Sequence, residues 1–121
     1  MKVMQMLNSI PVLEKLMTLS LPVIKAHKIY SLTKQINEQR EFFINEEKKM
    51  IEKYDAAALE DGRIQFQEEE KKTEFLKEHN ELLNFEVENL KPVILTLDDL
   101  ANCELSANDI ILLEDVIIIE E

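Results

Sequence analysis

Residues 22–54 read PVIKAHKIYSLTKQINEQREFFINEEKKMIEKY, and this stretch decides the fold. Large apolar residues fall on one heptad stripe along it: Ile29, Leu32, Ile36, Phe43 and Met50. Such a stripe predicts a single amphipathic helix that begins near Pro22 and ends near Tyr54. At 1.5 Å per residue its length is on the order of 50 Å. A helix of that length needs a partner along its apolar face.

A second helix is predicted after the only glycine in the chain. Asp61-Gly62 is a strong turn signal, and residues 63–66 alternate like a short strand. The stretch from Glu68 to about Leu83 then has the acidic start that the helix dipole favours. Its apolar positions are Phe75, Leu76, Leu82 and Leu83, with His79 on the same face. We therefore expect an antiparallel helical hairpin over about 21–84.

Shorter elements are predicted on both sides of the hairpin. Ser9 followed by Pro11 predicts the start of a short helix that ends near Leu19. In the tail, residues 96–99 predict a capped turn, and residues 106–109 repeat its S/T-x-x-D pattern. Residues 85–87, 92–95 and 116–119 suit strands, although periodicity alone does not separate helix from strand between 110 and 119. The sequence thus predicts one α+β domain over 1–121, with a long antiparallel helical hairpin, short capped helices and a small C-terminal sheet in a tail over about 85–121.

Charges are divided unevenly along the chain. Residues 1–54 carry nine basic and six acidic side chains, whereas residues 55–121 carry five basic and nineteen acidic ones, and the total is −11. After Lys91 there is no lysine or arginine, while residues 92–121 hold eight acids. Charge asymmetry is informative about partners rather than about fold. Here it favours a partner that is cationic or that normally grips nucleic acid.

Composition bounds the class of protein. A hydrophobic content of 45% is too high for a disordered acidic tail. The single cysteine, Cys103, excludes an internal disulfide and fits a reducing compartment. No stretch approaches the roughly 20 apolar residues that cross a bilayer, and no signal-peptide cleavage pattern follows the N-terminal apolar run. We expect a cytoplasmic protein.

No pattern of residues indicates catalysis or a bound cofactor. Neither His27 nor His79 belongs to a nucleophile–base pattern, and we expect His79 to be a packed or rim residue. The chain has no zinc-ligand spacing, and Gly62 alone cannot form a glycine-rich phosphate cradle. Glutamates are interleaved with the lysines of the long helix, which argues against a nucleic-acid groove. The sequence predicts a non-enzymatic protein without metal or cofactor.

The most continuous acidic surface is predicted on the second helix. Its candidate binding residues are Glu68, Glu69, Glu70, Glu74, Glu78 and Glu81. The last three are spaced four and three residues apart, so they share one helix face. Such a row can imitate the phosphate charge line of nucleic acid. Ordinary solubility is the alternative interpretation, because three lysines of the same helix partly neutralise the row.

Five stretches spread over most of the chain carry a resemblance. They are LPV at 21–23, IEKY at 51–54, DGRIQ at 61–65, EHNELLNFEV at 78–87, and LDDL with ELS between 97 and 106. In these stretches the chain resembles a family of small uncharacterised bacteriophage and prophage proteins from low-GC Gram-positive hosts. The resemblance implies a phage setting and brings no catalytic residues with it.

Two functional hypotheses follow. The first is a non-enzymatic, phage-type protein-binding module in the host cytoplasm. It would act as an inhibitor whose acidic helix occludes a basic surface of a host nucleic-acid-handling or defence protein, without binding nucleic acid or membrane itself. The alternative is a virion assembly factor or chaperone that acts through helix-mediated oligomerisation, with the apolar stripe of the long helix as the contact between copies.

Overall fold

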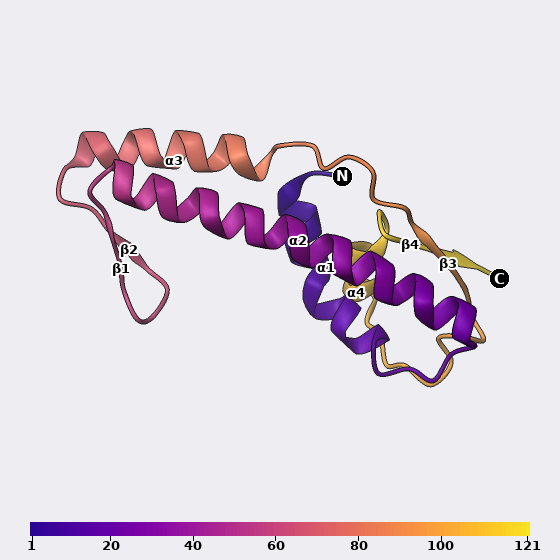
Figure 1. Cartoon of the computed structure of the whole chain (residues 1–121). Coiled ribbons are helices and arrows are strands. Elements are labelled where there is room, and N and C mark those ends of the chain that lie inside the picture. The colour runs from indigo at the N-terminus through magenta and orange to yellow at the C-terminus, as the bar shows by residue number, and fades with distance from the viewer.

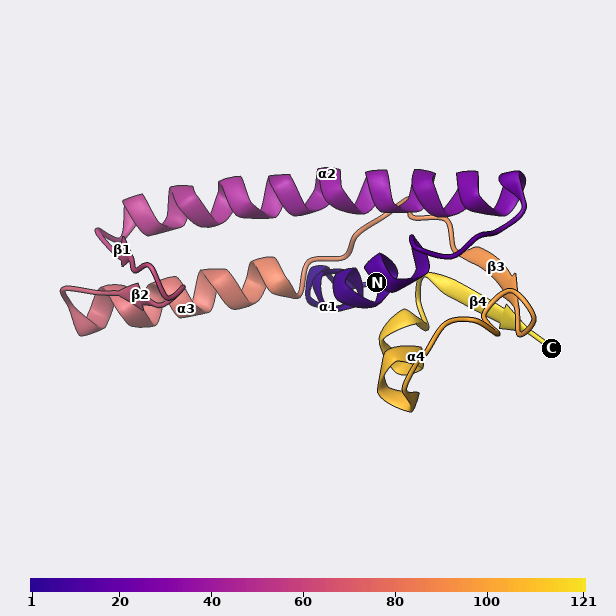
Figure 2. The same ribbon diagram turned by 90° about the horizontal axis from the view of Figure 1, so that it is seen from below.

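A long antiparallel helical hairpin dominates the computed structural model, which describes residues 1–121 (Figure 1). Helix α2 spans Val23–Lys53 and helix α3 spans Glu69–Leu83, so both predicted helices are confirmed to within one or two residues. All five residues of the apolar stripe on α2 are buried. Figure 2 shows α3 and α1 following one another along α2, so together they supply the partner that this helix requires.

The tip of the hairpin is a small antiparallel ribbon. Strands β1 (Ala57–Ala58) and β2 (Ile64–Gln65) pair around the predicted Asp61-Gly62 turn. Gly62 has a φ of +88°, a backbone conformation that glycine adopts without steric cost. The carboxylate of Asp61 accepts hydrogen bonds from the backbone N–H and the Nε of Arg63. The ribbon projects from the end of the helical hairpin as a short arm (Figure 1).

The predicted start of the first helix is wrong. Helix α1 spans Val3–Leu16, so Ser9 and Pro11 lie inside it. Ser9 is completely buried and its hydroxyl donates to the Met6 carbonyl instead of capping a helix end. The helix extends backwards because Val3 and Met6 continue its buried face. Burying two such side chains stabilises the helix by more than the single backbone hydrogen bond that Pro11 removes.

Residues 110–119, which the sequence alone does not assign to helix or strand, contain both a helix and a strand. Strand β3 spans Val93–Thr96, helix α4 spans Ala107–Leu113 and strand β4 spans Ile117–Glu120. The two strands are parallel, with Val93 opposite Ile117 and Thr96 opposite Glu120. A parallel pair needs a crossover, which α4 provides. These elements complete the α+β fold with the small C-terminal sheet that the sequence predicts.

Both predicted caps of the tail are confirmed. The Thr96 hydroxyl accepts from the Asp99 N–H, and the Asp99 carboxylate accepts from the Thr96 N–H. The same reciprocal pair joins Ser106 and Asp109 at the start of α4. Residues 85–87, in contrast, form no strand. Only an isolated antiparallel bridge joins Glu86 to Lys2, with hydrogen bonds from the N–H of Val3 to Phe85 and from that of Val87 to Met1.

The hydrophobic core is divided and small. Sixteen buried residues from α1, α2 and the tail form the main cluster, and Met50, Tyr54 and Phe75 form a second one near the tip. Only 20 of 121 residues are buried, and the accessible surface is 8542 Å². A compact monomer of 14.2 kDa would expose about 6,800 Å². The chain therefore exposes about 1,700 Å² more than a compact monomer of its mass.

Candidate protein-binding surface

Helix α3 is fixed to α2 through one aromatic side chain. Phe75 is 2% exposed, and its ring lies edge-on to Tyr54 and to Phe66 of the arm. His79 stacks on it with a centroid distance of 5.4 Å. The face of α3 that bears Phe75 and His79 is occupied by packing contacts within the chain. Only the remaining faces of the helix are available for an external partner.

Polar contacts reinforce the same interface. The Lys53 ammonium lies 2.8 Å from the Glu78 carboxylate, which also accepts a hydrogen bond from the Tyr54 hydroxyl. The lysine first, and then the tyrosine hydroxyl, hold the pKa of Glu78 below its ordinary value, because both favour the ionised carboxylate. Two turns earlier on α3, Lys71 lies 2.5 Å from Asp55. Glu78 is therefore part of the hairpin interface.

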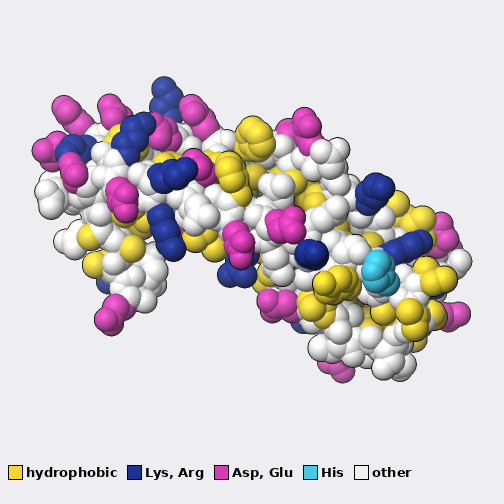
Figure 3. All heavy atoms as spheres, in the orientation of Figure 1, with side chains coloured by type: hydrophobic (Ala, Val, Ile, Leu, Met, Phe, Trp, Pro, Cys, Tyr) yellow, Lys and Arg dark blue, Asp and Glu magenta, His cyan; other side chains and the backbone are white.

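The six predicted glutamates consequently separate into two groups. Exposed side chains without an ion pair belong to Glu68, Glu69, Glu70, Glu74 and Glu81. Glu78 is half-buried and paired, so it does not extend the row formed by Glu74 and Glu81. We name the five exposed glutamates the α3 acidic surface. Figure 3 shows lysines interspersed with the acids at this end of the molecule.

His79 occupies the joint between the two hydrophobic clusters. Besides stacking on Phe75 of the tip cluster, its ring meets Phe43 of the main core edge-on, with centroids 5.8 Å apart. Its Nε2 lies 2.8 Å from the Glu47 carboxylate. The structure thus places His79 as a packed rim residue, as the sequence predicts. The contact with Glu47 was missed, because it joins two helices across 32 positions of sequence.

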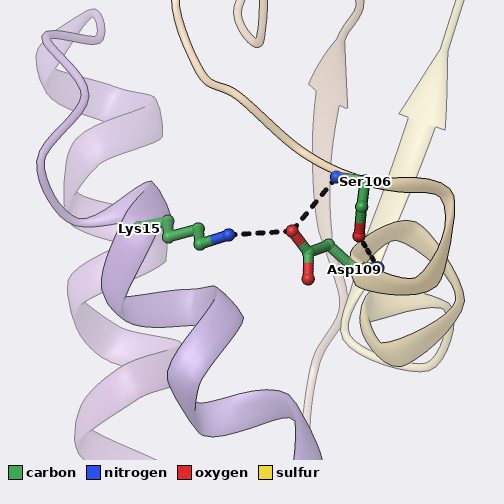
Figure 4. A network of polar contacts seen from close by, with 3 residues as sticks. All are labelled: Lys15, Ser106 and Asp109. Carbon is green, nitrogen blue, oxygen red and sulfur yellow. Dashed lines mark hydrogen bonds and ion pairs between the residues drawn. The ribbon is translucent and has the colours of Figure 1, made fainter.

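Two acids of the C-terminal tail form ion pairs with lysines near the N-terminus. Lys15 of α1 lies 2.9 Å from Asp109, and Lys25 of α2 lies 2.5 Å from Asp99 (Figure 4 shows the first pair). Each aspartate also accepts a hydrogen bond from the backbone N–H of its capping partner, Ser106 for Asp109 and Thr96 for Asp99. The lysine first, and the capped backbone N–H second, lower the pKa of each aspartate. One lysine from α1 and one from α2 therefore pair with acids of the tail.

The other six acids of residues 92–121 remain exposed and without an ion pair. They are Asp98, Glu104, Glu114, Asp115, Glu120 and Glu121.

Cys103 is half-buried and, with Lys15, lines an open cavity of about 530 Å³. No group of three or more His, Cys, Asp or Glu side chains is placed to hold a metal ion. None of the helices is long and apolar enough to cross a membrane.

Comparison with known proteins gives no relative from which a site could be transferred. No protein-family model, no curated protein and no solved structure matches the chain. The candidate surface is therefore defined by the geometry of its own residues.

Proposed function

We propose that this chain is a non-enzymatic protein-binding module of bacteriophage type that works in the cytoplasm of the host cell. Its α3 acidic surface would lie against a basic surface of a host nucleic-acid-handling or defence protein and keep nucleic acid away from it. The chain itself would bind neither nucleic acid nor membrane, and it would need no cofactor.

One observation carries this proposal. The glutamates of the α3 acidic surface are exposed and unpaired on a helix that is held against α2 by the buried Phe75 and by the Glu78–Lys53 pair. A helix that is already folded presents its charges in a fixed row, so they can match a basic channel without being ordered on binding.

A pull-down from a low-GC Gram-positive lysate, with partners quantified by mass spectrometry, tests the proposal. We expect a captured partner that is lost at high salt, because charge pairs at an exposed surface are screened. The triple variant Glu70→Lys, Glu74→Lys, Glu81→Lys should lose it. Glu78 stays unchanged because it holds the hairpin together.

A matched control reverses three acids of α2 that are also exposed and without an ion pair. These are Glu38, Glu41 and Glu52. If the control variant loses the partner as fully as the α3 variant does, binding depends on net charge alone. If neither variant loses it, the α3 acidic surface is not the binding site.

The alternative function, a virion assembly factor or chaperone, needs a different contact from the predicted one. The five stripe residues of α2 are only 1–9% exposed, so they cannot also join copies. Other apolar residues of the helices are exposed and remain for helix-mediated oligomerisation, and among them Met17 and Tyr30 border neighbouring cavities of about 300 Å³ and 330 Å³ along α1 and α2. Light scattering over a range of concentrations tests this alternative. Met17→Lys should dissociate any oligomer, and a monomer at high concentration contradicts it.

A further inference from the structure

A groove between α2 and β3 lies away from the α3 acidic surface, at the other end of the molecule. Its volume is about 310 Å³. Helix α2 contributes Lys28, Ser31 and Gln35, and the strand side contributes Lys91, Val93 and Ile94. Groove walls made of a helix and a strand are the arrangement in which several peptide-binding domains hold an extended segment.

The strand side of this groove is an unpaired sheet edge. The N–H of Val93 donates to Val116, and that of Leu97, directly after β3, donates to Glu120, so the N–H groups of positions 93, 95 and 97 face β4. The N–H groups between them point to the opposite edge. At Thr96 that N–H is occupied by the Asp99 carboxylate, whereas the N–H of Ile94 has no acceptor. At the outer edge of β3, the N–H of Thr96 is thus occupied, whereas that of Ile94, where the groove lies, is free to donate to a partner.

The charges in the groove are all of one sign. Lys28 and Lys91 are exposed and neither has an acidic partner. The side chains of Ser31 and Gln35 make no hydrogen bond within the chain. In a protein of net charge −11, an uncompensated pair of lysines in one groove complements carboxylates. Ile94, which is 49% exposed, adds an apolar contact beside them.

We propose that the groove binds an extended segment of a partner protein in which aliphatic and acidic side chains alternate. A backbone carbonyl of the segment accepts from the N–H of Ile94 and extends the sheet beyond β3. Its aliphatic side chains pack on Ile94, and its carboxylates lie near Lys28 and Lys91. This inference does not depend on the α3 acidic surface, because the two sites share no residue and attract opposite charges.

The test uses the full chain and a blocked octapeptide of alternating valine and glutamate, followed by ¹⁵N–¹H NMR. At about 1 mM peptide we expect shifts at the backbone amides of residues 28–35, 91 and 93–95. The variant Lys28→Gln, Lys91→Gln should weaken binding by about tenfold or more. The matched variant Lys34→Gln, Lys48→Gln removes two exposed, unpaired lysines elsewhere on α2 and should weaken it by less than about twofold.

Several outcomes of these binding experiments would overturn the proposal. Equal weakening by the two variants means diffuse charge attraction, and equal binding of a valine–lysine peptide removes the role of the lysines. A proline at the centre of the peptide should abolish binding, so retained binding excludes strand addition. If the same amides shift when the protein is concentrated without peptide, a second copy occupies the groove. Circular dichroism of both variants checks folding, which should be unchanged because none of the four lysines makes an ion pair.

Discussion

The two ends of α2 are stabilised in different ways. We call the body the assembly of α1, α2 as far as Phe43, and residues 85–121 with β3, α4 and β4, and we call the tip the last turns of α2 with β1, β2 and α3. The body buries sixteen core residues, whereas the tip cluster contains three. Polar contacts such as Lys53–Glu78 and His79–Glu47 contribute a larger share of the tip's stability. Regions with few buried contacts open locally at lower free energy, so the tip should unfold before the body.

Core truncations should produce the largest difference between the regions. Leu95 is completely buried in the body, and Leu95→Ala should lower the free energy of unfolding of the whole chain by about 2–5 kcal/mol. Phe75→Ala removes the centre of the tip cluster, a change that costs about 3–5 kcal/mol in a cooperative core. Its effect should remain local, because the tip shares few core residues with the body.

Hydrogen exchange with mass spectrometry distinguishes the two responses. Phe75→Ala should increase exchange over residues 50–83 and leave residues 93–119 protected, while Leu95→Ala should increase exchange in both. Ile94→Ala, a truncation at a half-exposed position of the same strand, is the control for Leu95. Loss of protection throughout the chain in Phe75→Ala would show that tip and body unfold as one unit.

The sequence predicts what depends on local pattern and misses what depends on tertiary contact. The buried apolar stripe of α2 is predicted in full because its heptad spacing is visible in the sequence alone. The start of α1 is missed because Ser9 and Pro11 carry a local signal that the burial of Val3 and Met6 overrides. Glu78 cannot be told from Glu74 by residue type. Only the position of Lys53, brought near by the hairpin turn, gives it a structural role.

Acid should destabilise the body more than the tip. The pKa is lowered for Asp99 and Asp109 in the body and for Glu78 in the tip. A carboxylate with a lowered folded pKa contributes stability that is present above its unfolded pKa and is lost as the pH falls through the folded value. The ordinary values of 3.8 and 4.5 place this loss below about pH 4.5.

Thermal melting at pH 7 and at about pH 3 measures the effect. The variant Asp99→Asn, Asp109→Asn should melt at a lower temperature than the unchanged chain at pH 7, and this gap should narrow in acid. Asp98→Asn neutralises an exposed acid without an ion pair and should change neither melt. A gap that is as wide at pH 3 as at pH 7 would mean that ionisation of these aspartates does not stabilise the fold.

A smaller effect is expected from the cap of α4. Ser106→Ala removes the oxygen that accepts from the Asp109 N–H at 3.0 Å and should cost about 1 kcal/mol, or about 3–6 °C in Tm. Ser106→Thr keeps a capping hydroxyl and should recover most of the loss. Because α4 belongs to the body, exchange should increase over 93–119 and not at the tip. Equal melting of the two variants would show that the cap hydrogen bond contributes nothing measurable.

The smallest effect separates the glutamates of α3. Glu78→Gln removes a charge that pairs with Lys53, so exchange should increase modestly and only at the tip. Glu74→Gln and Glu81→Gln should leave exchange unchanged, because neither side chain makes an ion pair within the chain. If all three substitutions leave the tip unchanged, its stability depends on Phe75 and its aromatic neighbours alone. In that case Glu78 is also free to bind a partner, and the α3 acidic surface gains a sixth residue.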